Sequence, residues 1–151
     1  DGVTASFEQH GISGVATYLA STNLPKNYVD PVDAGNNGVA VNTVPVKYDA
    51  AATKKAQLQQ IITQKWIANF PEGQEAWSEY RRTGFPKLFP VLVNASAGTI
   101  DSALGIRRVN FVDSEKAGNP QGVASALPLL GGPDNGGTRL WWDKDVEIIQ
   151  N

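Results

Sequence analysis

Two consecutive tryptophans near the end of the chain, Trp141 and Trp142, are the residues best suited to stack on a ligand. A sugar ring presents C–H groups on its faces, and an indole offers them a flat apolar surface. Asp143 follows directly, and its carboxylate can accept hydrogen bonds from hydroxyl groups. The glycine-rich stretch Gly131–Gly137 before them predicts a flexible loop. We therefore take Trp141, Trp142 and Asp143 as candidate ligand-binding residues.

The placement of the two indoles has two alternatives. In an extended segment neighbouring side chains point to opposite faces, so one tryptophan would anchor the loop while the other faces outward. Alternatively both are buried, as large apolar side chains usually are.

A second cluster combines aromatic, acidic and cationic residues in the stretch EAWSEYRRTG, from Glu75 to Gly84. Gly73 to Thr83 is predicted to be a helix that Gly84 caps. Trp77 and Arg81 then lie one turn apart, which allows a cation–π contact, and Glu79 can pair with Arg82. This cluster could pack against the preceding helix or form a second stacking surface for sugars.

Other residue combinations with chemical potential are weak. His10 is the only histidine and has no cysteine or evident acidic partner, which disfavours a nucleophilic triad or a zinc site. Glu75 and Glu79 are one turn apart, but glycosidase carboxylates flank a cleft. Asp143-x-Asp145, or Asp134 with Asn135, lacks the spacing of an EF-hand calcium loop. We expect no enzyme activity, no metal and no cofactor.

The bulk composition is that of a folded protein. The chain has 151 residues, of which 41% are hydrophobic and 19% charged, and its net charge of −2 gives nucleic-acid binding no electrostatic support. No apolar run approaches the roughly 20 residues that span a bilayer. The chain has no Cys and no Met, and it begins at Asp1. We therefore expect a processed or trimmed piece of a larger protein.

The elements that must position these residues are mostly helical. Apolar and helix-favouring residues predict helices over 3–19, 49–70 and 73–83, with a helical turn after Pro120. The last two long helices should form a hairpin across the short Pro71–Gly73 link. We expect Ile62, Trp66 and Trp77 to be largely buried in it. Residues 89–93 could be a strand, and residues 23–46 and 105–138 read as long loops.

The stretch ITQKWIANFPEGQEAWSEYRRTGFPKL, from Ile62 to Leu88, closely resembles the central motif of the SusD/RagB family. FEQHGISG (Phe7–Gly14), IRRVNFVDSE (Ile106–Glu115) and GGPDNGGTRLWWDKD (Gly131–Asp145) resemble further family segments in the same order. The segment Ile106–Glu115 departs from the family where Phe111-Val112 replaces a usual Tyr-Pro. The resemblance implies an architectural role for the following matched residues: Trp66, Glu75, Trp77, Tyr80, Arg81, Arg82 and Gly84.

The resemblance also implies a mainly α-helical fold, with tetratricopeptide-like helix pairs elsewhere in the protein and long irregular loops here. It assigns residues 1–151 to the C-terminal portion of one SusD/RagB-like domain, without an internal boundary. It implies a Bacteroidetes-type lipoprotein on the outer face of the outer membrane, lipid-anchored through an N-terminal part absent here. Such a protein binds oligosaccharide and delivers it to a TonB-dependent transporter of the SusC type.

Two other functions remain open at this stage. The chain could be a structural or partner-interaction module of the same complex, with the ligand site outside it. A glycoside hydrolase would require a pair of carboxylates across a cleft.

Overall fold

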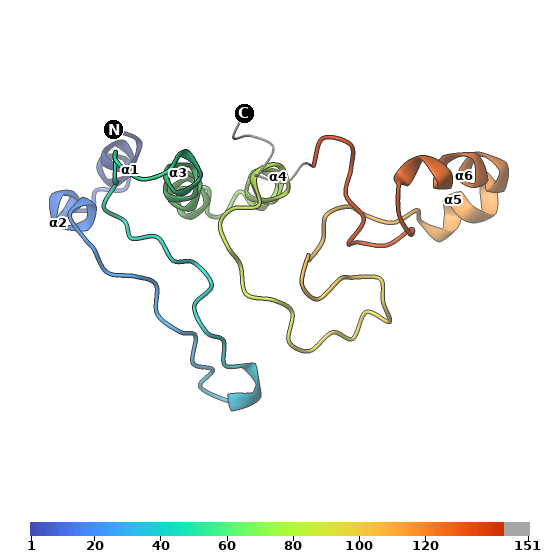
Figure 1. Cartoon of the computed structure of the whole chain (residues 1–151), viewed down its shortest axis with the longest axis horizontal. Helices are drawn as coiled ribbons and strands as arrows, with labels where there is room; N and C mark the ends of the chain where they lie inside the picture. The colour runs from blue at the N-terminus through green and yellow to red at the C-terminus, as the bar shows by residue number, and fades with distance from the viewer. Residues whose placement is uncertain (144–151) are drawn as a thin grey trace. The chain divides into compact units, whose positions relative to one another are not determined.

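The computed structural model describes residues 1–143, and all their regular secondary structure is helical, as predicted (Figure 1). The described residues form two compact units, residues 1–89 and residues 90–143. The first unit contains α1 (Gly2–Gln9), α2 (Val15–Leu19), the 3-10 helix η1 (Ala34–Asn36), α3 (Lys54–Ala68) and α4 (Gly73–Thr83). The second contains α5 (Asp113–Gly118), α6 (Pro120–Ala126) and η2 (Leu127–Leu130).

The predicted helix over 3–19 is wrong as a single element, because α1 ends at Gln9 and α2 begins at Val15. Gly11 (φ 64°) and Gly14 (φ 91°) adopt left-handed backbone conformations that stop a right-handed helix. The amide of Ile12 donates to the carbonyl of Phe7, which closes the end of α1. The apolar residues that predicted one helix are therefore distributed over two short helices.

The helices α3 and α4 form the predicted hairpin. The α4 helix begins and ends where expected, and Gly84 (φ 70°) caps it in the left-handed conformation. The α3 helix begins at Lys54 rather than at residue 49, because the Thr53 hydroxyl accepts the amide of Ala56 as an N-cap. The preceding residues form turns, in which the Asp49 carboxylate accepts the amide of Ala51.

The core of the first unit is a small apolar nucleus in which Phe85, fully buried, packs against Ile62 and Leu58 of α3. Ile62 is buried as predicted, and Trp77 is half-buried. The prediction for Trp66 is wrong, since 39% of this residue is exposed. Phe85 contacts the middle of α3, and Trp66 lies one turn beyond Ile62 toward the end of that helix.

Buried glutamines of α3 hold the long loop between α2 and α3. Gln60 Nε2 donates to the carbonyls of Pro45 (3.2 Å) and Lys47 (2.7 Å), and Gln59 Nε2 donates to Asn42 Oδ1 (2.7 Å). In Figure 1 this loop runs away from the helices to η1 and returns. Its two arms pair at one bridge, between Tyr28 and Gly38. One face of α3 therefore buries polar side chains because they are hydrogen-bonded to backbone carbonyls and to the Asn42 side chain of the loop.

The second unit has helices on both sides of Asn119; the sequence indicated only the helical turn after Pro120, and α5 lies in a stretch that was read as loop. Asn119 caps α6 by accepting the amide of Gly122. Residues 90–93 form no strand, although the amide of Val91 donates to the carbonyl of Ser102. Among the described residues of this unit, Val123 is the one buried apolar side chain. Its other buried side chains are polar: Arg107, Arg108, Thr138 and Asp143.

Candidate functional site

The tandem tryptophans occupy the two central positions of a tight turn in the second unit. The amide of Asp143 donates to the carbonyl of Leu140 over 2.9 Å, which closes the turn around Trp141 and Trp142. Trp141 is 82% exposed, whereas Trp142 is half-buried. The expected extended conformation is therefore wrong, and so is the alternative that both indoles are buried. One indole faces outward from the turn.

Asp143, the third candidate ligand-binding residue, points inward and is 2% exposed. Arg107 Nε donates to its Oδ2 over 2.7 Å, and Arg107 Nη2 donates to its Oδ1. Arg139 Nη1 adds a third hydrogen bond to Oδ1 at 3.2 Å. A two-pronged guanidinium–carboxylate contact fixes both distance and direction. The Asp143 carboxylate therefore holds arginines in place and does not line the exposed surface beside Trp141.

Asp134 plays a comparable part in the glycine-rich stretch before the turn. Its Oδ1 accepts Arg108 Nη1 (2.6 Å) and the amide of Phe111 (3.0 Å), and Lys116 Nζ lies 3.4 Å from its Oδ2. Burial alone would raise the pKa of Asp134, but the hydrogen bond from Arg108 and the contacts of Phe111 and Lys116 outweigh it, so the pKa is lowered. The carboxylate thus stays charged and anchors the stretch.

Gly136 ties the same stretch to two other segments by its backbone. Its amide donates to the carbonyl of Thr99 (2.6 Å), and its carbonyl accepts the amide of Arg107 (2.7 Å). A Cβ at this position would lie 2.9 Å from the Thr99 oxygen, so the approach requires glycine. From Pro133 to Gly137 the stretch expected to be a flexible loop is therefore hydrogen-bonded, and it leads to the turn from a held position.

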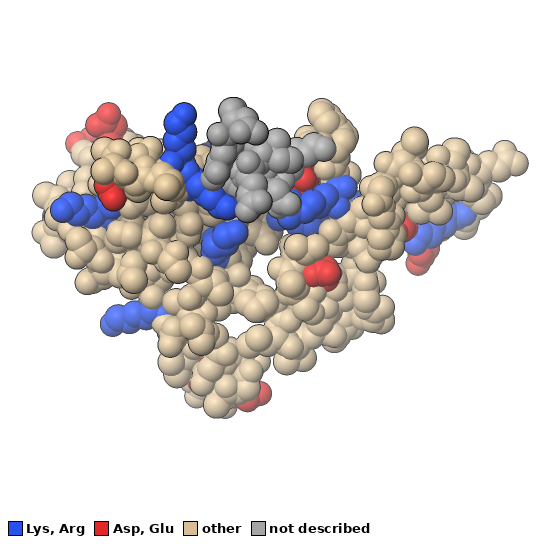
Figure 2. All heavy atoms as spheres, in the orientation of Figure 1, with Lys and Arg blue, Asp and Glu red and all other residues tan. Residues whose placement is uncertain are grey.

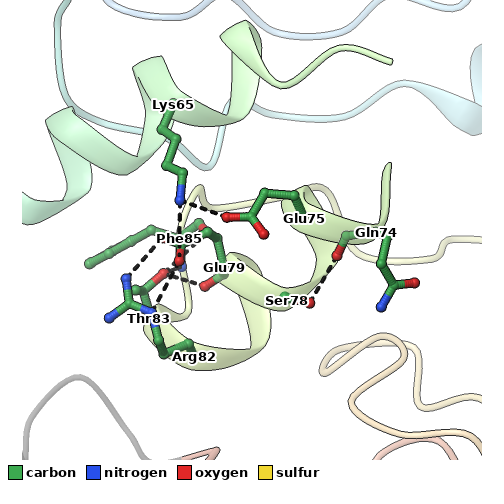
Figure 3. Close-up of polar contacts among 8 residues, drawn as sticks. All are labelled: Lys65, Gln74, Glu75, Ser78, Glu79, Arg82, Thr83 and Phe85. Atoms are coloured by element: carbon green, nitrogen blue, oxygen red, sulfur yellow. Dashed lines mark hydrogen bonds and ion pairs between the residues drawn. The ribbon is translucent and has the colours of Figure 1, made fainter. Parts of the chain in front are cut away.

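The EAWSEYRRTG cluster forms an ion-pair network between α3 and α4 (Figure 3). Lys65 Nζ lies 2.8 Å from Glu75 Oε1 and 3.5 Å from Glu79 Oε1. Arg82 Nη2 lies 2.9 Å from Glu79 Oε2. The hydrogen bond from Arg82 holds the pKa of Glu79 below its ordinary value, and the hydrogen bond to Glu75 raises the pKa of Lys65. The network joins the two helices of the hairpin.

The remaining contacts of this cluster are also internal. The guanidinium carbon of Arg81 lies 3.5 Å from the centroid of the Trp77 ring, as the helical spacing predicted. Thr83 Oγ1 donates to the carbonyl of Glu79 (2.7 Å) and accepts the amide of Phe85 (3.1 Å). These two hydrogen bonds of Thr83 connect the last turn of α4 to Phe85, the buried residue of the apolar nucleus. These contacts favour packing over ligand stacking for Trp77.

The histidine and the aspartates that the sequence offered for catalysis or metal binding do not form a common site in the described residues. His10 is exposed at the end of α1. Asp134 and Asp143, the proposed calcium ligands, pair with arginines, and Asp145 lies outside the described residues. Within residues 1–143 there is no group of three or more His, Cys, Asp or Glu side chains placed to hold a metal ion. No helix in this range is long and apolar enough to cross a membrane.

An apolar groove of about 450 Å³ lies in the first unit, and the sequence did not indicate it. Val3 of α1, Ile61 of α3 and Tyr48 of the preceding loop are among its lining residues. A second hollow of about 280 Å³ is lined by Phe7, Ile67 and Phe70, among others. Charged side chains are interspersed with uncharged ones on the face shown in Figure 2. The groove itself is lined mostly by uncharged residues.

Comparison with known proteins gives a consistent result. A family model described as "SusD-like: Susd and RagB outer membrane lipoprotein" matches residues 1–143. No curated protein sequence matches the chain. A solved structure of a chitin-binding SusD homolog from Flavobacterium johnsoniae is 62% identical, with a TM-score of 0.83 over 95% of this chain and 30% of that chain.

Two further solved structures agree. A SusD homolog from Bacteroides vulgatus is 46% identical, with a TM-score of 0.83 over 95% of this chain and 29% of that one. A SusD homolog from Bacteroides ovatus is 42% identical, with a TM-score of 0.84 over 95% and 31%. The chain therefore spans about 30% of the length of the solved proteins it matches.

Proposed function

This chain belongs to the SusD-like family, the Susd and RagB outer membrane lipoproteins, and from that membership we propose that it takes part in binding a glycan at the outer-membrane surface. The match over residues 1–143 is the observation that carries the proposal. It agrees with the family resemblance that the sequence motifs indicated. Because the chain spans about 30% of its solved relatives, it supplies one part of the binding protein.

We propose a chitin-type oligosaccharide as the ligand. The support is the 62% identity with a homolog described as chitin-binding. Chitin is a polymer of N-acetylglucosamine, whose rings have apolar faces and whose rims carry hydroxyl and acetamido groups. An aromatic side chain can stack on such a face while nearby polar groups bind the rim.

Within this chain we propose Trp141 as the ligand-contacting residue. Its indole is 82% exposed at the tip of a hydrogen-bonded turn, so stacking requires little reordering of the backbone. Trp142, half-buried, anchors the turn, and Asp143 holds it from within. The motif residues of α3 and α4, among them Trp77 and Arg81, have the architectural role that the resemblance implied.

The test is an isothermal titration calorimetry experiment in which the full-length protein is titrated with chitohexaose. Trp141→Ala should weaken binding about tenfold, since a well-stacked aromatic contributes about 1.4 kcal/mol. Trp141→Phe should recover most of the affinity because it keeps a flat ring. Leu129→Ala, another highly exposed apolar residue of the same unit, should bind like the parent. Equal affinity of Trp141→Ala and the parent would remove Trp141 from the site.

We further propose that the protein binds glycan without cleaving it. In the described residues the carboxylates of the two candidate regions are engaged by cations: Glu75 and Glu79 by Lys65, Asp134 and Asp143 by arginines. Chitohexaose should therefore be recovered intact after long incubation, as judged by chromatography. Release of shorter oligosaccharides in proportion to protein concentration would support a glycosidase instead.

The proposed partners are a SusC-like TonB-dependent transporter and the remainder of the same protein. The proposed location is the outward face of the outer membrane, with the lipid anchor on a preceding segment. Unit 1 supports the intramolecular partner, because its apolar groove and exposed Ile61, Ile67 and Phe70 offer surface for packing. Co-purification of transporter and full-length protein from membranes tests the first partner.

The alternative function is that of a structural or partner-interaction module whose ligand site lies outside this chain. The same exposed apolar surface of unit 1 favours it. If Trp141→Ala keeps its affinity for chitohexaose while substitutions at Ile61 or Ile67 abolish co-purification with the transporter, this alternative is the correct one.

A further inference from the structure

We infer that Arg107 is a positioning residue for Trp141: it acts on the ligand through the buried Asp143 carboxylate and the turn that carries the exposed indole. The inference rests on the proposed function, because it assigns the residue that holds the proposed contact. Arg107 lies 36 positions before Asp143 in the sequence and is itself 3% exposed. Its side chain is buried and bonded to Asp143, so its effect on a ligand is exerted through that contact.

The argument begins with the turn. Trp141 follows Leu140 and precedes Trp142, and a backbone hydrogen bond from the Asp143 amide to the Leu140 carbonyl closes the turn. This bond holds the ends of the turn together but does not by itself fix the direction in which the exposed Trp141 points. The Asp143 side chain adds the restraint, since Arg107 grips both of its carboxylate oxygens. The direction in which Trp141 leaves the surface is thus set by a contact on the opposite side of the turn.

Arg107 is in turn held by its backbone. Its amide donates to the carbonyl of Gly136 over 2.7 Å, and the amide of Gly136 donates to Thr99. The guanidinium therefore projects from a fixed point, and it completes a two-pronged contact that a lysine ammonium cannot reproduce. Arg139 also reaches Asp143, at 3.2 Å and from four residues away, whereas Arg107 reaches it from a distant segment.

The neighbouring arginine supplies a matched control. Arg108 is 6% exposed, and its side chain pairs with Asp134 rather than with Asp143. Loss of the Arg108 contact therefore removes a buried ion pair from the same unit without touching the turn. The two lysine substitutions, Arg107→Lys and Arg108→Lys, each keep the positive charge.

The experiment is a double-mutant cycle in the full-length protein with chitohexaose as the probe. Arg107→Lys should weaken binding about tenfold, as Trp141→Ala does, while Arg108→Lys should stay within about twofold of the parent. In the Trp141→Ala background, Arg107→Lys should cause no further loss, because the indole it positions is absent. Where Trp141→Ala itself weakens binding, a further loss of similar size there, or unchanged affinity of Arg107→Lys alone, would overturn the inference. If Arg107→Lys does not fold, Asp143→Asn, which keeps the side-chain size, takes its place in the cycle.

A second measurement separates this inference from the proposed function. In protein labelled with 5-fluorotryptophan, the ¹⁹F resonance of Trp141 is identified by its loss in Trp141→Phe. Arg107→Lys should shift that resonance in the absence of ligand, and Arg108→Lys should leave it in place. If Trp141→Ala does not weaken chitohexaose binding but the shift occurs, the ligand assignment fails and the positioning role stands. If no shift occurs, the positioning role fails whatever the binding result.

Discussion

The first unit, residues 1–89, and the second, residues 90–143, are held together by different interactions. In the first, Phe85 and Ile62 form an apolar nucleus, and the capped helices α3 and α4 pack around it. In the second, Arg107 and Arg108 are buried with Asp143 and Asp134, and a glycine-rich stretch is bonded to them. Apolar contact is non-directional and adapts to changes of shape, whereas a hydrogen-bonded ion pair specifies positions of individual atoms.

This difference bears on where each unit places its exposed groups. The apolar nucleus of the first unit leaves Trp66 partly exposed and a groove beside α3 uncovered, which suits a surface that packs against a further part of the protein. The ionic contacts of the second unit end at a turn that holds one indole outward. A unit with little apolar core can thus present a single side chain in a defined direction.

The largest expected effect tests the apolar nucleus. Phe85→Ala should lower the free energy of unfolding by about 3–5 kcal/mol, because it empties a fully buried aromatic site. Urea unfolding of the full-length protein, with hydrogen exchange of the α3 and α4 amides, measures the loss. Val32→Ala, at a 93% exposed apolar position of the same unit outside the apolar groove, should change stability by no more than about 0.5 kcal/mol. Equal losses for the two variants would show that Phe85 is not the nucleus.

A smaller effect tests the close backbone packing of the second unit. Gly136→Ala should cost about 1–3 kcal/mol, since the added Cβ would lie 2.9 Å from the Thr99 carbonyl oxygen and the backbone must move. Gly118→Ala is the control, because a Cβ there meets no atom within 4 Å and Gly118 is the last residue of α5. Thermal melting should separate the two variants. A melting temperature of Gly136→Ala equal to that of the parent would contradict the close approach.

Helix caps give the next effect and bear on both units. Thr53→Ala removes the N-cap of α3, and Asn119→Ala removes the N-cap of α6, each at a cost of about 1 kcal/mol. Hydrogen exchange should show faster exchange in the first turn of the affected helix. Thr53→Ser and Asn119→Asp, which keep a capping oxygen, should restore slow exchange. Failure of the conservative variants to do so would assign the loss to packing instead.

The smallest effect concerns the acid sensitivity of the network in Figure 3. The hydrogen bond from Arg82 lowers the pKa of Glu79 below its value in the unfolded chain. The stabilisation from Glu79 is therefore complete above the unfolded pKa of about 4.3 and is lost as pH falls through the folded pKa. The side chains of its partners, Lys65 and Arg82, are about half-exposed, so this stabilisation should amount to only about 0.2–0.5 kcal/mol. Glu79→Gln should lack this part of the acid-induced loss in pH-dependent melting, whereas Glu72→Gln should retain it.

The sequence predicted correctly those features that depend on residues close to one another in the chain. The bounds of α4, its glycine cap and the Trp77–Arg81 contact all follow from residues within a few positions of one another. The break between α1 and α2 was missed because helical periodicity does not report the left-handed glycines Gly11 and Gly14. The family itself was identified from motif order, which the match over residues 1–143 confirms.

Long-range contacts account for what the sequence could not provide. The turn at Trp141 depends on Arg107, and no local pattern connects residues 36 positions apart. The residue types alone assigned Asp143 to the ligand-binding site together with Trp141. In the structure Asp143 is buried and Trp141 is exposed, so the two residues have different roles. Trp66 was expected in the core because its spacing from Ile62 is helical, and only the position of Phe85 along α3 shows otherwise. The buried glutamines of α3 are a related case, since they bond the distant loop: Gln60 bonds its backbone carbonyls and Gln59 the side chain of Asn42.

The adjacent arginines also bear on protein engineering. Arg107 and Arg108 bind Asp143 and Asp134, so two neighbouring residues tether both ends of the segment that joins these aspartates. The contour length of that segment is therefore constrained, and an epitope tag inserted into it would pull one carboxylate from its arginine. Ala97 and Gly98 lie in an exposed turn of the same unit. A reporter sequence placed between them would leave both tethers intact, which makes that turn the better attachment point for following the protein on a cell surface.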